Sequence, residues 1–223
     1  MQGNAVRAGV LGAGDGLTTN ISVILGVAGA TTDTSTVRLA GIASLLAGAF
    51  SMAAGELVSV RAHDELVQHE INVERRELSD DPTGEQLELA TMYRARGVPS
   101  ADATTVARIL MANPALALDT HARLELGIDP GDTGSSRQAA AVSFLSFALG
   151  AVLPLLPWFF TTGTPAVLSS IVIGALAALA LGATIGSFSE QGVWRTAGRQ
   201  FLAVTVAASV TFGVGHLLGV GAS

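Results

Sequence analysis

The chain has 223 residues, of which 49% are hydrophobic and only 13% are charged, and its mean hydropathy is +0.52. This composition favours several membrane spans over one soluble domain. Because the sequence contains no cysteine, disulfide bonds and thiolate metal ligands are excluded.

Five apolar segments follow one another along the chain, and each exceeds the roughly 20 residues that cross a bilayer as a helix. The first imitates a signal peptide, but its length and an internal aspartate favour a retained span. We therefore predict an all-α membrane protein with five transmembrane helices and a three-helix cytosolic insert between helices 2 and 3. The predicted spans are 7–30, 36–60, 138–160, 165–188 and 195–219, and the predicted domains are 1–60, 61–137 and 138–223.

The arginines predict the topology. All 12 basic residues are arginines, and eight of them lie in 61–137. Because basic residues gather on the cytosolic side, we expect the N-terminus, 61–137 and the 189–199 loop to be cytosolic and the C-terminus to lie outside. Trp158 is expected at the outer interface. With no extension before Arg7, we expect a prokaryotic plasma membrane rather than a vacuole.

Asp15 is the most informative residue of the first span, because it lies in an otherwise uncharged stretch. A carboxylate at membrane depth costs a few kcal/mol or more and is usually kept for an ion, a proton or a partner charge. Asp15 therefore predicts a role in moving or holding a cation. A protein that uses its spans only as an anchor has no need of such a residue.

The insert at 61–137 holds 14 of the 18 acidic residues and carries the whole net charge of −6. We expect span 2 to continue as a helix to about residue 78 and to break at 80–84. A second helix is predicted over 83–96. A third is predicted over 100–127, with Ser100 as its cap and a kink at Asn113-Pro114.

Spacing brings the acids of the insert into pairs on shared helix faces. Glu74 and Glu77 are three residues apart, and so are Glu85 and Glu88. His121 lies four residues before Glu125. If the helices converge, the donors suit Mn²⁺, Fe²⁺ or Zn²⁺ better than Cu⁺. The alternatives are a solvated acidic face for the glutamates and simple packing for His121. The predicted insert ligands are Glu74, Glu77, Glu85, Glu88, His121 and Glu125.

Several motifs closely resemble the vacuolar iron transporter family. They are Gly14-Asp15-Gly16-Leu17-Thr18-Thr19-Asn20, Ser51-Met52-Ala53-Ala54-Gly55-Glu56, Asn113-Pro114, Leu124-Glu125-Leu126-Gly127 and Leu153-Pro154-Leu155-Leu156-Pro157. The resemblance implies a homodimer that moves Fe²⁺, and often Mn²⁺, out of the cytosol in exchange for protons. It places metal-binding glutamates at the five insert positions named above.

The resemblance also assigns Asp15 and Met52 to the translocation path. Helical rise puts both about 12 Å from the cytosolic surface, so they can meet at one level. Glu56, one turn from Met52, is a ligand at the mouth of the path, a proton carrier, or merely an interfacial acid. Two departures from the family pattern concern ligands: Ser44 replaces a glutamate of some relatives, and His121 replaces a methionine.

The leading functional prediction is a proton-coupled exporter of Fe²⁺ or Mn²⁺. The alternative is a membrane-anchored metal buffer or sensor that does not transport. No catalytic motif is present, so we do not expect an enzyme. We expect metal and protons as substrates, Zn²⁺ as a further ion for the insert, and no cofactor. The expected partners are a second copy and the lipid bilayer, and no nucleic acid.

Overall fold

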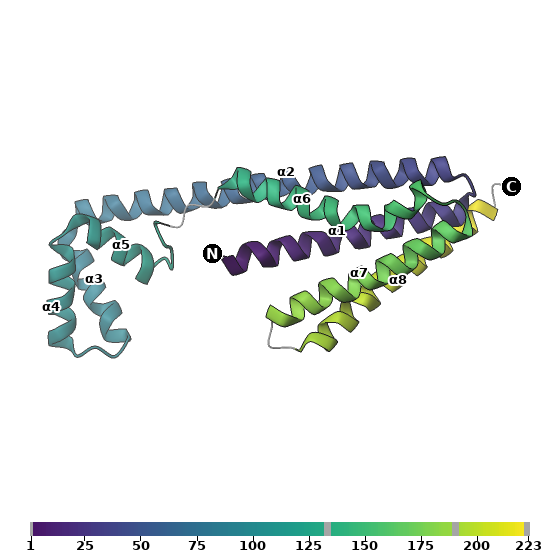
Figure 1. Cartoon of the computed structure of the whole chain (residues 1–223). Helices are drawn as coiled ribbons and strands as arrows, with labels where there is room; N and C mark the ends of the chain where they lie inside the picture. Colours follow the sequence, from purple (N-terminus) through teal and green to yellow (C-terminus); the bar gives the residue numbers. More distant parts are fainter. Residues whose placement is uncertain (1, 132–134, 189–191, 221–223) are drawn as a thin grey trace. The chain divides into compact units, whose positions relative to one another are not determined.

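A computed structural model describes residues 2–131, 135–188 and 192–220, and the side chains of 9–219 within them (Figure 1). All regular structure in these ranges is helical, which confirms the predicted fold class. The side chain of Arg7, residues 189–191 of the predicted loop and the C-terminal 221–223 lie outside this description. The helices are α1 (Gln2–Ala30), α2 (Thr34–Asp80), α3 (Pro82–Ala95), α4 (Ser100–Met111), α5 (Pro114–Leu124), α6 (Ser136–Leu155), the 3₁₀ helix η1 (Leu156–Phe159), α7 (Thr164–Phe188) and α8 (Val193–Val220).

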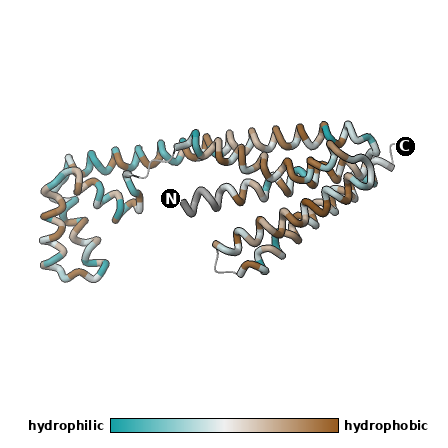
Figure 2. Tube along the Cα trace, viewed as in Figure 1, coloured by the Kyte–Doolittle hydropathy of each residue, from teal (hydrophilic) through white to brown (hydrophobic). Residues whose placement is uncertain are grey.

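The chain divides into two compact units, one formed by 1–57 with 137–223 and the other by 58–136. Among the described residues, five helical stretches are long and apolar enough to span a membrane, as predicted. Figure 2 shows hydrophobic residues along α1, α6, α7 and α8, whereas hydrophilic residues are concentrated in α3 to α5 and the later part of α2. The five stretches are Gly9–Ala30, Thr34–Asp80, Ser136–Phe159, Thr164–Phe188 and Val193–Gly219.

Glycines allow the helices of the first unit to pack backbone against backbone. A side chain at Gly16 would overlap the carbonyl of Phe147, and one at Gly150 would overlap the carbonyl of Ala13. These contacts join α1 to α6, and Gly215 against Gly26 joins α1 to α8 in the same way. Lipid gives helices no hydrophobic reason to associate, so such close contacts supply the packing energy.

The end of α6 is shaped by its prolines. Pro154 cannot donate a backbone hydrogen bond, and the chain continues as the 3₁₀ helix η1. The Ser170 hydroxyl of α7 donates to the Pro154 carbonyl at 2.7 Å, and the Trp158 indole donates to Ser170 at 2.9 Å. Trp158 is therefore buried in the packing between helices, where Ser170 accepts its N–H, and its level at the outer interface stays a prediction.

The second unit consists of the polar end of α2 and the short helices α3, α4 and α5. Its core is formed by Leu89, Ala90 and Ala107. The predicted helix over 100–127 is two helices, because the Asn113 side chain accepts from the backbone N–H groups of the next turn and caps a new helix at Pro114. Ser100 is the first helical residue of α4 rather than its cap, and the cap position is Pro99.

Candidate metal centre

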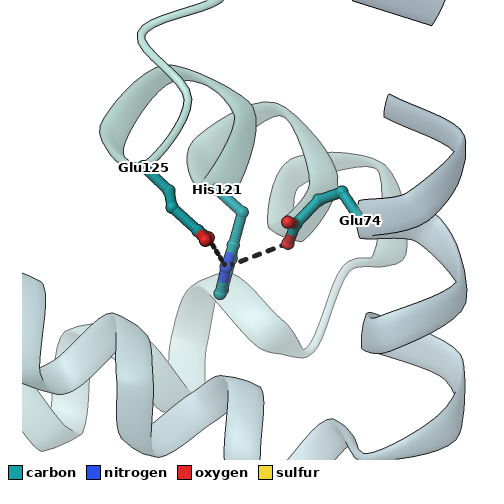
Figure 3. Close-up of side chains that lie close together, drawn as sticks. All are labelled: Glu74, His121 and Glu125. Atoms are coloured by element: carbon teal, nitrogen blue, oxygen red, sulfur yellow. Dashed lines mark ion pairs between the residues drawn. The ribbon is translucent and has the colours of Figure 1, made fainter. Parts of the chain in front are cut away.

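Three side chains of the second unit converge on one point. Glu74 comes from α2 and His121 from α5, and Glu125 directly follows the last residue of α5 (Figure 3). One donor atom from each lies within 4.8 Å of the other two. His121 Nδ1 is 3.1 Å from Glu74 Oε1 and 3.7 Å from Glu125 Oε2. A fourth donor, Glu85 Oε2 from α3, lies 3.5 Å from the same nitrogen.

This donor set is largely withdrawn from solvent. His121 is fully buried and Glu74 is 2% exposed, whereas the Glu125 side chain is 34% exposed and forms the open side. Among the described residues, Glu74 Oε1 and both ring nitrogens of His121 make no hydrogen bond. Leaving a buried polar group without a partner costs about 1–3 kcal/mol. Glu74 Oε1 and His121 Nδ1, which lie 3.1 Å apart, therefore form part of a site suited to a cation.

The electrostatics of the site favour the same conclusion. Burial, and to a lesser extent the negative charges of the neighbouring glutamates, together raise the pKa of Glu74 to about 7. Burial and those charges also raise the pKa values of Glu85 and Glu125. Burial lowers the pKa of His121, so its imidazole is neutral at physiological pH. At neutral pH the Glu74 carboxyl group is therefore partly protonated, and a cation would have to displace that proton.

The remaining two predicted insert ligands lie at the rim. Glu77 and Glu88 are exposed, and they act on the buried carboxyl groups through their charge. Thus the structure brings together four of the six predicted ligands, namely His121 and the three glutamates around it. The donor set of three carboxylates and one imidazole matches the preference of Fe²⁺, Mn²⁺ and Zn²⁺ for oxygen and nitrogen ligands.

Local backbone structure fixes the ligands of α5. The backbone N–H of Glu125 donates to the His121 carbonyl at 2.8 Å, so the two ligands share the last turn of the helix. Gly127 then adopts a φ of +68°, which allows Ile128 N–H to donate to the Ala122 carbonyl at 2.9 Å and end the helix. The Leu-Glu-Leu-Gly motif is thus a helix end that carries one ligand.

In the first unit, Met52 lies at the meeting of three helices. A methyl group at Gly12 of α1 would lie 3.4 Å from Met52 Cε, 3.7 Å from its sulfur and 3.0 Å from Ser146 Cβ of α6. Asp15 follows Gly12 by one turn and is exposed on the surface of the single chain. Glu56 and Ser44 are both half-buried on α2.

A sequence model described as the VIT family matches residues 6–216. The chain belongs to the VIT family. The vacuolar iron transporter of Acanthamoeba castellanii is 37% identical over 213 residues, which are 95% of this chain and 78% of that protein. Vacuolar iron transporter 1 of Eucalyptus grandis is 29% identical over 213 residues, which are 95% of this chain and 86% of that protein. Vacuolar iron transporter 1 of Arabidopsis thaliana is 30% identical over 211 residues, which are 94% of this chain and 84% of that protein.

Membership of the VIT family confirms the resemblance drawn from the sequence motifs. Because the matched relatives are transporters by name, the expectation that the chain is not an enzyme is confirmed by family. The protein is an integral membrane protein with five candidate spans. Whether Asp15, Met52, Glu56 and the insert glutamates bind metal stays a prediction.

Sequence reasoning gave no role to one buried polar residue of this VIT-family chain. Asn20 is fully buried between helices, and its amide donates to the Ala151 carbonyl of α6 at 2.6 Å. Its Oδ1 makes no hydrogen bond. The signal was an asparagine within an apolar span, five residues after Asp15. The contact ties α1 to α6 just before the Pro154 end of that helix.

Proposed function

We propose that this VIT-family protein exports Fe²⁺, and also Mn²⁺, from the cytosol in exchange for protons. The observation that carries the proposal is the group of Glu74, Glu85, His121 and Glu125, in which the buried atoms Glu74 Oε1, His121 Nδ1 and His121 Nε2 make no hydrogen bond. The similarity to vacuolar iron transporters, which extends over 95% of this chain, supports iron as the substrate. The oxygen-rich donor set with one nitrogen supports a divalent transition metal.

Proton exchange follows from competition at shared carboxyl groups. With the pKa of Glu74 raised to about 7, metal binding near neutral pH must release protons. Metal and protons would compete in the same way for Asp15 in the membrane, so that protons enter the cytosol as metal leaves it. A carboxylate beside the Met52 thioether suits a borderline cation such as Fe²⁺ better than Mg²⁺ or Ca²⁺. Glu56 would receive metal at the mouth of this path.

The arginine distribution supports the direction of transport. Eight of 12 arginines lie in 61–137, so the insert is proposed to face the cytosol, where it gathers metal for export. The C-terminus would then lie on the opposite side. The insert would also accept Zn²⁺, because its donors suit that ion as well.

A homodimer is proposed because Asp15 is exposed on the single chain within a candidate span. A carboxylate facing lipid is costly, and a second copy covering this face would replace lipid with protein and water. The natural chain has no cysteine, so single-cysteine variants give a clean test. Leu11→Cys, one turn before Asp15, should crosslink two copies in membranes, whereas Leu176→Cys on α7 should not. Equal crosslinking of both variants would count against this interface.

The alternative function is a membrane-anchored metal buffer or sensor. Proteoliposomes that contain a metal-sensitive dye distinguish the two functions. A transporter raises lumenal Mn²⁺ or Fe²⁺ far above the amount of protein present, and an outward proton gradient accelerates the uptake. A buffer binds at most a few ions per chain and leaves the dye unchanged. Binding without lumenal accumulation, with or without the gradient, would favour the buffer.

A further inference from the structure

One guanidinium joins the C-terminal ends of two helices in the metal-binding unit. Arg96 follows the last residue of α3, and its Nη1 donates to the Met92 carbonyl of that helix at 3.2 Å. Its Nη2 donates to the Leu124 carbonyl at 2.9 Å. Leu124 is the last residue of α5, 28 positions away in the sequence. Arg96 thus ties the end of α3 to the end of α5.

The accepting carbonyl lies directly before a ligand of the candidate metal centre. The last carbonyls of a helix have no partner within the helix and form its negative end. At α5 this end is the peptide between Leu124 and Glu125, whose carboxylate forms the open side of the donor set. A donor held at that peptide restricts its rotation and therefore the direction of the Glu125 side chain.

We propose that Arg96 is a positioning residue that holds Glu125 in the metal-binding arrangement. The inference rests on the proposed function, because it assumes that the insert binds metal. Arg96 makes its tie through backbone carbonyls, and among the described residues no carboxylate forms an ion pair with it. The effect of Arg96 therefore passes through the position of the α5 end rather than through direct contact with the ion.

The chain supplies a matched control in Arg94. It lies in the last turn of α3, carries the same charge and is likewise exposed. Its Nη2 donates to the Thr91 hydroxyl at 2.6 Å, which is a contact within α3. Arg94→Gln therefore removes one positive charge near the site and leaves the link between the two helices intact. Arg96→Gln removes the same charge and the link together.

The test measures Mn²⁺ affinity and Co²⁺ visible absorption on the full chain in detergent micelles. Arg96→Gln should weaken Mn²⁺ binding on the order of 10- to 100-fold, the range seen when a group that orients a ligand is lost. Arg94→Gln should leave the affinity within about threefold of the parent, since exposed charges contribute little. The Co²⁺ spectrum should change in Arg96→Gln alone, because one carboxylate leaves the ion.

A double-mutant cycle with Glu125→Gln separates positioning from general stability. If Arg96 acts through Glu125, Arg96→Gln should have no further effect on affinity in the Glu125→Gln background. Arg96→Lys keeps the charge but reaches only one carbonyl, so its Mn²⁺ affinity should lie between those of the parent and Arg96→Gln. It also provides a folded variant if the glutamine change unfolds the insert.

Two results would overturn the positioning role. One is an Arg96→Gln affinity equal to that of Arg94→Gln, and the other is an undiminished effect of Arg96→Gln when Glu125 is already glutamine. Failure of the proposed function looks different. In that case the parent protein itself shows no Mn²⁺ binding that depends on the insert glutamates, and the roles of the site and of Arg96 are overturned together.

Discussion

The pH dependence of metal binding by the insert follows from the unusual pKa of Glu74. This carboxyl is buried among other glutamates, and its pKa is raised to about 7. Metal binds the ionised form, so a falling pH should weaken binding as Glu74 takes up a proton. His121 does not titrate in this range, because burial lowers its pKa and keeps the imidazole neutral, so the loss is assigned to Glu74.

The expected magnitude separates Glu74 from an ordinary carboxylate. A group with a pKa of about 7 is about 90% ionised at pH 8 and about 10% ionised at pH 6. Metal affinity should therefore fall about tenfold between these values, which is about 1.4 kcal/mol. A glutamate with an ordinary pKa near 4.5 would stay more than about 95% ionised, and affinity would change by under about 5%. The raised pKa values of Glu85 and Glu125 act in the same direction.

Calorimetric titration of Mn²⁺ into the full chain at pH 6, 7 and 8 measures this effect. Repeating the titration in two buffers of different ionisation enthalpy counts the protons released, and about one should be released per ion near pH 6.5. Glu74→Gln is the control: it should bind more weakly at pH 8 and show a much flatter pH profile. An affinity of the parent that does not change between pH 6 and pH 8 would refute the assignment of the proton to Glu74.

Three further predictions follow from named contacts. Asp15→Asn should abolish Mn²⁺ flux in liposomes, and retained flux would refute the role of Asp15. Size-exclusion chromatography should show an unchanged fold and assembly, since the change is nearly isosteric and removes an intramembrane charge. His121→Ala should lower insert affinity at every pH and His121→Met should restore part of it; parent-like titrations for both would mean that glutamates alone form the site. Gly150→Ala would press a methyl group on the Ala13 carbonyl and should lower stability by about 1–3 kcal/mol. Gly213→Ala, which meets nothing within 4 Å, should not change the thermal unfolding of the protein; equal effects would contradict this packing account.

Much of the fold could be predicted because its signals are local. Apolar segments longer than a bilayer crossing located all five candidate spans, and Pro82 and Gly97 marked the ends of α3. The helix over 100–127 was predicted as one kinked element. It is two helices because the Asn113 side chain supplies a cap that a proline alone does not provide.

The candidate site was only partly predictable, because burial depends on tertiary packing. The spacing of Glu74 and Glu77 placed both on one helix face, yet only Glu74 reaches the donor set. Their roles are decided by where α5 packs, which spacing within α2 does not specify. For the same reason, two contacts could not be predicted: that of Arg96 with a carbonyl 28 residues away, and that of the Asn20 amide with α6.

The central claim is that metal and protons exchange through one membrane path. The most direct measurement records lumenal Mn²⁺ and lumenal pH together in proteoliposomes, for the parent and for Asp15→Asn. With the insert facing outward, external Mn²⁺ should enter while the lumen becomes more alkaline, at a fixed ratio of protons to metal, and Asp15→Asn should stop both changes. Mn²⁺ uptake with no change of lumenal pH, or equal uptake by Asp15→Asn, would contradict the claim.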